Sequence, residues 1–182
     1  MPNISDILAK YLDDLFVIKI KVTIKRLLNI SFSLNNMDKA IIENTPNTGF
    51  YLEIGGNDGV TQSNTYLLSQ GNWNGILIEP NYPKYKICKH TRPNDIVINS
   101  ACTSFQYTKN YIYLSDDNLE STQYNLNPST DQYIAPADCL NNILKAHHAP
   151  RTIDFFSLDV EGAELEVLKG IDHEYFQFKL IL

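Results

Sequence analysis

The sequence predicts an α/β fold in which a doubly wound, mostly parallel sheet has a Rossmann-like arrangement. The first observation is that apolar runs of five or six residues alternate with segments of helical periodicity from residue 50 onward. Continuously apolar strands are typical of a parallel sheet that helices cover on both faces. The second observation is the composition: the chain has 182 residues, 43% hydrophobic and 20% charged. This fits one globular domain with a substantial core.

The N-terminal segment is predicted to form a helical cap. Residues 4–16 place apolar side chains at helical spacing, whereas residues 18–25, IKIKVTIK, fit either an alternating strand or a continuing helix. The loop signal NTPNTG at residues 44–49 then interrupts the pattern. We therefore expect an N-terminal helical cap over residues 1–45 and a Rossmann domain over residues 46–182.

The elements of the main domain are predicted from apolar runs and from their boundary residues. Strands are expected at residues 50–54, 75–79, 95–99, 153–158 and 178–182. Helices are expected at residues 63–70, at 82–90, at 138–147, and after 159 as far as Gly170. Residues 103–135 are expected to form an irregular section with strand-like pieces and a polar loop.

Composition and charge exclude several classes of protein. The net charge of −6 disfavours nucleic acid as a partner, because phosphate binding needs a positive surface. The cysteines, Cys88, Cys102 and Cys139, are scattered, which argues against a disulfide framework and a zinc site. Asp6 stands where a signal peptide would be basic, and no apolar run approaches a membrane span. A cytoplasmic protein without a transmembrane segment is expected.

The basic residues of the N-terminal helix allow two interpretations. Lys19, Lys21, Lys25 and Arg26 could contact an anionic membrane surface, or they could form the solvated face of a helix, where such residues normally lie. The helix could also join two copies of the chain.

Glycines directly after the strand at 50–54 indicate a turn that receives a ligand. Gly55, Gly56 and Gly59 let the backbone approach a ligand closely, at the end of a strand where α/β sheets bind ligands. A P-loop is excluded because no G-K-[ST] follows, and GGNDG does not supply the dinucleotide fingerprint G-x-G-x-x-G.

Two carboxylates indicate which ligand the turn receives. Glu79 ends the next strand, 26 residues after Glu53, where a carboxylate accepts both hydroxyls of a ribose. Glu53 lies at the turn itself, where a carboxylate is unfavourable beside a pyrophosphate but favourable beside an ammonium or sulfonium. S-adenosylmethionine therefore fits this turn better than NAD or ATP.

Four successive blocks give the sequence a resemblance to a known family. The blocks are YLEIGGNDGVTQSNTYLL, GNWNGILIEPNYPKY, INSACTS and IDFFSLDVEGAELEVLKG. Together they resemble the FkbM-type methyltransferases over about residues 49–182. The resemblance implies a class I fold that binds S-adenosylmethionine and methylates hydroxyl oxygens of sugars or other small molecules.

The resemblance also implies which residues bind the cofactor. The turn would hold the methionine part, Ser63 to Thr65 would line it, Glu79 would bind the ribose, and the others would lie near the adenine or the amino group. The implied set is Glu53, Gly55, Gly56, Asn57, Asp58, Gly59, Ser63, Asn64, Thr65, Glu79, Pro80, Asn81, Ser100, Ala101 and Asp159.

The segment DVEGAE at residues 159–164 is the candidate catalytic segment. Asp159 or Glu161 could be a general base for the acceptor hydroxyl, or the acids could hold a divalent metal. Acids at this place also stabilise a helix N-terminus through its dipole. We assign Asp159 and Glu161 as the catalytic candidates and assign no metal ligand.

The C-terminal residues FKLIL leave the resemblance short of the family pattern. Class I methyltransferases have the sheet order 3-2-1-4-5-7-6, and by this resemblance the last two strands and their helix are absent from the chain. A fragment, a truncated reading frame and a domain completed by a partner are the alternatives that this leaves open. An exposed terminal strand invites pairing with another chain, which predicts a homo-oligomer through that edge. Two other functions stay open: a non-catalytic remnant that serves as an interaction module, and an NAD-dependent Rossmann oxidoreductase.

Overall fold

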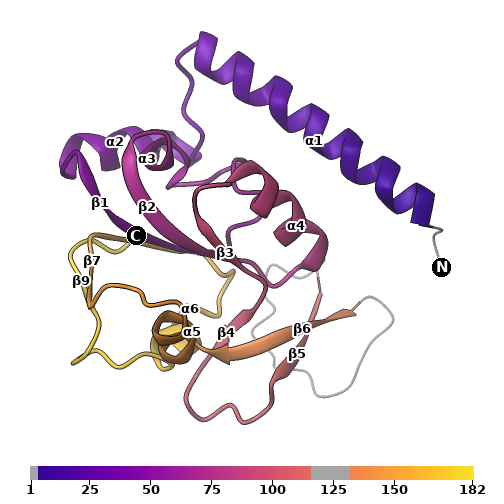
Figure 1. Cartoon of the computed structure of the whole chain (residues 1–182). Coiled ribbons are helices and arrows are strands. Elements are labelled where there is room, and N and C mark those ends of the chain that lie inside the picture. Colours follow the sequence, from indigo (N-terminus) through magenta and orange to yellow (C-terminus); the bar gives the residue numbers. More distant parts are fainter. Residues whose placement is uncertain (1–3, 116–131) are drawn as a thin grey trace.

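The structure of the chain is a computed structural model that describes residues 4–115 and 132–182 (Figure 1). Its helices are α1 (Ile4–Leu27), the 3-10 turn η1 (Leu34–Asn36), α2 (Met37–Asn44), α3 (Tyr66–Ser69), α4 (Tyr82–Thr91), α5 (Leu140–Ala146) and α6 (Glu164–Leu168). Its strands are β1 (Thr48–Ile54), β2 (Asn72–Ile78), β3 (Ile96–Ile98), β4 (Ala101–Thr103), β5 (Tyr111–Ser115), β6 (Gln132–Cys139), β7 (Thr152–Ile153), β8 (Phe155–Leu158) and β9 (Gln177–Phe178).

The central sheet has four parallel strands in the order β3-β2-β1-β8. Leu52 of β1 pairs with Ile76 of β2 on one side and with Phe156 of β8 on the other. The chain therefore builds outward from β1 in one direction and later returns to add β8 on its other edge. This reversal of strand order is the switch point at which doubly wound sheets bind ligands. The predicted α/β, doubly wound fold is confirmed.

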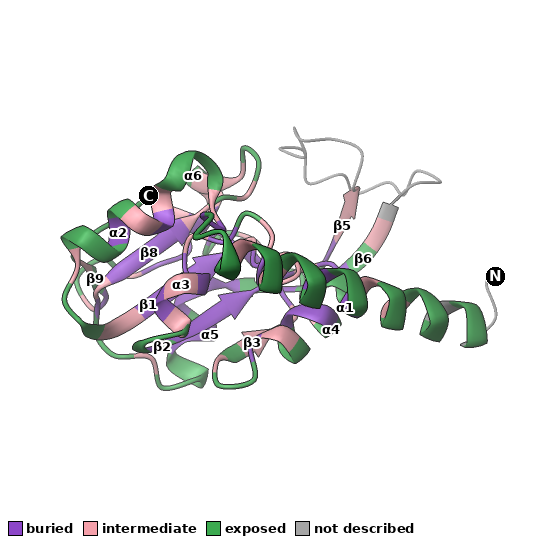
Figure 2. Ribbon diagram, turned by 90° about the horizontal axis from the view of Figure 1, so that it is seen from above, coloured by how far each residue is buried: buried purple, intermediate pink, exposed green. Residues whose placement is uncertain are grey.

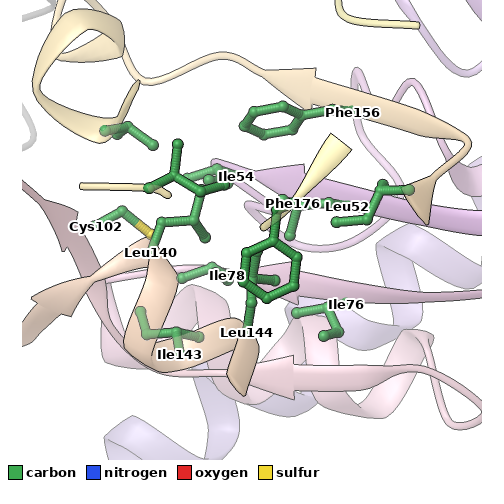
Figure 3. Close-up of a cluster of buried hydrophobic side chains, with 13 residues drawn as sticks. Leu52, Ile54, Ile76, Ile78, Cys102, Leu140, Ile143, Leu144, Phe156 and Phe176 are labelled. Atoms are coloured by element: carbon green, nitrogen blue, oxygen red, sulfur yellow. The ribbon is translucent and has the colours of Figure 1, made fainter. Parts of the chain in front are cut away.

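Helices cover both faces of this sheet. On one face, Tyr51, Leu77 and Phe155 pack against α2, α3 and α4. On the other face, the neighbouring strand residues pack against α5 and α6, and Figure 3 shows Ile54, Ile78, Leu140 and Phe176 meeting in this core. Successive strand residues thus enter opposite cores, which explains why these strands are apolar throughout rather than alternating.

The predicted strand at 178–182 lies where it was expected, beside β7 and β8. The amide of Lys179 donates to the carbonyl of Ile153 at 3.0 Å, and the amide of Phe156 donates to the carbonyl of Leu180 at 2.9 Å. Regular strand pairing covers only β9, which pairs with β7.

A second, three-stranded sheet has the order β4-β6-β5. The helix predicted at 138–147 begins later, at Leu140, because residues 132–139 form β6. Ala135, Ala137 and Cys139 are buried, while Ile134 and Pro136 between them are exposed, a two-residue alternation that belongs to a strand.

Helix α1 decides between the two alternatives for residues 18–25, and helix α3 is shorter than predicted. Residues 18–25 belong to α1, in which Ile18 is buried and Val22, four residues later, is partly buried on the same side. The helix predicted at 63–70 is reduced to α3, and the hydroxyl of Ser63 accepts a hydrogen bond from the amide of Tyr66 at 3.0 Å before it begins.

The N-terminal helix packs on the main domain through a narrow face. Leu15 and Ile18 of α1 join a cluster with Phe32, Tyr66 and Ile87. Within the described residues, no helix combines the length and the apolar character that crossing a membrane requires. The predicted domain boundary at residue 45 stays a prediction.

Candidate cofactor site

The carboxyl ends of β1, β2 and β8 meet at the glycine turn. Gly55 has φ +87°, and a Cβ at this position would lie 2.1 Å from the carbonyl oxygen of Asp159. The amides of Gly55 and Gly56 donate to the carbonyl of Ile78 at 3.0 and 3.1 Å. Since the turn contacts the backbone of both neighbouring strands, glycine is required at position 55 for conformation and for space.

The second half of the turn is fixed by its own side chains. The carboxylate of Asp58 accepts hydrogen bonds from the amides of Val60 and Thr61 at 2.8 and 2.6 Å. Gly59 has φ +82°, and a Cβ there would lie 2.7 Å from the Thr91 hydroxyl oxygen. Asp58 and Gly59 therefore shape the turn rather than line a cavity.

Two neighbouring cavities open above these strand ends. The first has a volume of about 250 Å³, and its walls include apolar residues such as Ala101, Ile112 and Val160. The second has a volume of about 170 Å³ and is mainly polar. The residues that line both cavities are Ile54, Gly55, Glu79, Lys84, Asp159 and Glu161. A ligand of small-molecule size can extend from one cavity into the other.

Glu79 lies in the wall between the two cavities. The side chain is buried, and its two oxygens accept hydrogen bonds from the amides of Asn57 and Asn81, each at 2.8 Å. The two amides fix the direction of both carboxylate oxygens. The wall therefore presents an oriented acceptor group to the site.

Glu53 is buried and bonded to several protein groups. Its carboxylate accepts hydrogen bonds from the Ser63 and Thr65 hydroxyls, the latter at 2.6 Å, and from the amide of Asn64 at 3.1 Å. The guanidinium of Arg92 lies 3.5 Å away. Burial raises the pKa of Glu53, while Arg92 and the hydroxyl donors oppose that rise. Glu53 thus has a structural role, because it holds segment 63–65. Its electrostatic role toward a cationic ligand stays a prediction.

Arg92 is a buried residue that the sequence did not single out. Its guanidinium lies between the rings of Tyr51 and Tyr66, with centroid distances of 5.6 and 5.5 Å, and its Nε lies 3.2 Å from Asp95. Arg92 therefore compensates the charge of Glu53 behind the glycine turn. A lone arginine in TRPND carries no pattern that would have revealed this.

The catalytic candidates Asp159 and Glu161 are both exposed and line both cavities. The loop that carries them is held by Glu164, whose Oε1 accepts hydrogen bonds from the amides of Val160 and Gly162 at 3.2 and 3.1 Å. Burial raises the pKa of Glu164, but the backbone hydrogen bonds outweigh it and the net shift is downward. Glu164 thus performs the helix-start role, which leaves Asp159 and Glu161 available to a ligand.

The predicted site residues divide into two groups by position. The residues that line a cavity are Glu53, Gly55, Gly56, Asn57, Ser63, Asn64, Glu79, Pro80, Ser100, Ala101, Asp159 and Glu161. The residues that do not are Asp58, Gly59, Thr65 and Asn81. Thr65 bonds to Glu53, and the side chain of Asn81 accepts from the amide of Lys84 at 3.1 Å to cap α4. Their roles in binding stay predictions.

Other wall residues were missed by the sequence analysis. Lys84 lies in the first turn of the helix after Glu79, so its position in the sequence could have revealed it. Leu114 and Tyr133 reach the first cavity from β5 and β6 and have no recognisable motif. Within the described part of the chain, no group of three or more His, Cys, Asp or Glu side chains is placed to hold a metal ion.

Comparisons with known proteins assign most of the chain to a family. A family model described as the Methyltransferase FkbM domain matches residues 53–182. Among solved structures, a TehB-like SAM-dependent methyltransferase from Corynebacterium glutamicum is similar with a TM-score of 0.36 and 9% identity, over 53% of this chain. The chain spans about half (51%) of the length of that protein. No curated protein matches the chain.

Proposed function

Because the chain belongs to the FkbM methyltransferase domain family, we propose that it binds S-adenosylmethionine and methylates a hydroxyl oxygen of a small molecule or sugar. The observation that carries the proposal is the order of surfaces along the site. An apolar cavity, the carboxylate of Glu79 and a polar cavity follow one another. S-adenosylmethionine presents an adenine, a ribose diol and a charged amino acid in the same order.

Each part of the site suits the part of the cofactor assigned to it. Pro80, Ser100 and Ala101 line the first cavity, where the adenine would lie. Asn57 and Asn64 line the second cavity and offer polar groups to the amino acid part. Glu79, already oriented by two backbone amides, would accept the ribose hydroxyls between them.

The charges of the walls favour a sulfonium over a pyrophosphate. Glu79, Asp159 and Glu161 line both cavities, and among the described residues of the two walls Lys84 is the one cation. Carboxylates near a positive sulfonium lower its energy, whereas the same carboxylates repel a pyrophosphate. This supports S-adenosylmethionine over NAD as the ligand.

The catalytic contribution of the chain is proposed to be alignment and proton removal. When bound, the cofactor supplies a methyl group that the sulfonium has already activated. The walls orient the acceptor hydroxyl and exclude water, which supplies much of the rate of such a transfer. Asp159 or Glu161 would take the hydroxyl proton as a general base.

Cofactor binding is tested by calorimetric titration with S-adenosylhomocysteine. The Glu79→Ala variant should bind more weakly than the parent by roughly 1 to 3 kcal/mol, since charge-assisted hydrogen bonds are lost. Glu174→Ala, which removes an exposed carboxylate outside both cavities, is the matched control and should bind as the parent does. Binding of NADH but not of S-adenosylhomocysteine would instead favour the oxidoreductase.

The general base is tested by transfer of labelled methyl from S-adenosylmethionine to a panel of sugars and hydroxylated small molecules. Either Asp159→Asn or Glu161→Gln should lower kcat by about 10²- to 10⁴-fold. In Glu161→Gln, S-adenosylhomocysteine affinity should change little, because Glu161 is not in the implied cofactor-binding set. Full turnover by both variants would contradict the assignment. Binding by the parent without turnover across the panel would favour the non-catalytic remnant.

A further inference from the structure

Helix α1 carries a row of large apolar side chains that are exposed rather than packed on the rest of the molecule. These side chains recur about every four residues, so successive members are neighbours on the helix surface and the row turns by about 40° per step around the axis. We call this set the outer stripe; it consists of Leu8, Leu12, Phe16, Ile20, Ile24 and Leu27. Each of these side chains is at least 44% exposed, and Phe16 at the centre is 66% exposed.

The contacts of α1 with the main domain lie outside the outer stripe. Leu15 and Ile18 fill the cluster beneath the helix, and Arg26 bonds to the side chain of Gln70. Figure 2 shows that α1 is exposed along nearly its whole length and that its N-terminal end projects beyond α4. An exposed apolar face of this extent marks an interaction surface.

Charges are distributed unequally between the two halves of α1. The N-terminal half has three carboxylates, Asp6, Asp13 and Asp14, against the one cation of Lys10. The C-terminal half has four cations and no carboxylate. Lys25 and Arg26 bond to Ser31 and Gln70 of the same chain, and Lys19 and Lys21 are exposed.

We propose that the outer stripe binds the outer stripe of a second copy of this chain, with the two α1 helices antiparallel. A two-fold axis at Phe16 places Leu12 against Ile20 of the second copy. It also places the acidic half of each helix against the basic half of the other. Each contact then occurs twice, as a symmetric dimer interface requires.

The charge pattern favours a second copy over a lipid surface. A helix that lies on an anionic bilayer presents cations along its length, whereas the projecting half of α1 carries Asp6, Asp13 and Asp14. The same pattern disfavours a parallel pair, because carboxylates would then face carboxylates. An antiparallel pair covers the apolar residues and opposes unlike charges in one arrangement.

Oligomeric state is the first measurement, by sedimentation velocity over a concentration series. The parent should form a reversible dimer of twice 20.8 kDa, and Phe16→Glu should weaken it at least about 10-fold, because a charge would enter the centre of the interface. Leu165→Glu, at a leucine of α6 that is 64% exposed, is the matched control and should dimerise as the parent does. Circular dichroism spectra of the variants should match that of the parent, which checks that their helices are retained.

Cysteine cross-linking tests the antiparallel register. Phe16→Cys should form a disulfide-linked dimer with itself, and a mixture of Leu12→Cys and Ile20→Cys chains should form a mixed dimer. Leu12→Cys alone should form less, because its two copies would lie about 12 Å apart along the helices. The native cysteines are buried and remain in every variant.

Three results would overturn the proposal. One is a parent that stays monomeric up to about 100 µM. Another is a dimer that Phe16→Glu leaves intact. The third is binding of the parent, but not of Phe16→Glu, to anionic vesicles without any dimer in solution, which would assign the outer stripe to a membrane surface.

Discussion

Gly55 shows at the scale of one residue how the sequence specifies the site. The position combines a left-handed backbone conformation with a close approach to the backbone of Asp159, 104 residues later in the chain. The sequence alone predicted a glycine turn that comes close to a ligand. The structure adds that the turn also comes close to another strand end. Side chains at position 55 would therefore disturb both walls of the site at once.

The Gly55→Ala variant is expected to be less stable and to bind S-adenosylhomocysteine more weakly. A non-glycine residue in this conformation costs roughly 1 to 3 kcal/mol, and the clash with the Asp159 carbonyl adds to it. Denaturant unfolding and calorimetric titration measure the two effects.

Gly71→Ala is the matched control for this substitution. Gly71 lies in the connection between α3 and β2; its φ is not positive, and a Cβ there would lie 3.4 Å from the nearest atom, the Leu68 carbonyl oxygen. Equal losses in the two variants would show that any glycine replacement in this region is harmful. The account given for Gly55 would then be wrong.

The connection between α1 and α2 is ordered by one buried carboxylate. Asp38 accepts hydrogen bonds from the amides of Phe32 and Lys39 at 2.6 and 2.9 Å and from the hydroxyls of Ser31 and Ser33. Burial raises its pKa, but these donors outweigh burial and hold the pKa below the usual value. Asp38 thus fixes the chain reversal that places α1 on the main domain.

This downward shift makes stability depend on pH. A carboxyl with a lower pKa in the folded than in the unfolded chain stabilises fully above its unfolded value of about 3.9, and the contribution disappears as pH falls through the folded pKa. The free energy of unfolding of the parent should therefore decrease as pH falls below about 4. Asp38→Asn should lose roughly 1 to 3 kcal/mol at neutral pH and show a weaker decrease in acid.

Glu43→Gln provides the control on the same helix. Glu43 is an exposed residue of α2, so its replacement should leave both the unfolding free energy at neutral pH and its slope in acid close to those of the parent. A parent whose stability is flat between pH 6 and the acid range would count against the role of Asp38.

Helices and strands were predictable where the apolar residues fit one periodicity, and ambiguous where they fit both the helical and the strand periodicity. The buried strands β1, β2 and β8 are apolar runs bounded by turn residues, and no helical pattern fits them. Residues 18–25 fit both the two-residue period of a strand and the period of a helix. In the structure they continue the preceding helix as part of α1. In residues 132–139 the strand pairs with β5 and β4, and these long-range partners override the local preference for a helix start.

The whole molecule shows why only part of the site was predictable. Ile54, Glu79 and Asp159 line the cavities and lie at the carboxyl ends of β1, β2 and β8 or directly after them. The carboxyl ends of parallel strands share one edge of the sheet, so these positions were predictable. Leu114 and Tyr133 come from the second sheet, whose position relative to the first depends on packing that no local pattern records. The buried pair of Glu53 and Arg92 likewise joins segments 39 residues apart.

The two hydrogen bonds that hold the side chain of Glu79 determine when its conformational entropy is lost. The amides of Asn57 and Asn81 belong to the cofactor turn and to the residue that caps α4. The rotamer freedom of this side chain is therefore lost when the chain folds and not when a ligand arrives. A ligand that meets Glu79 has no side chain left to order there, so each hydrogen bond it forms contributes more of its strength to affinity.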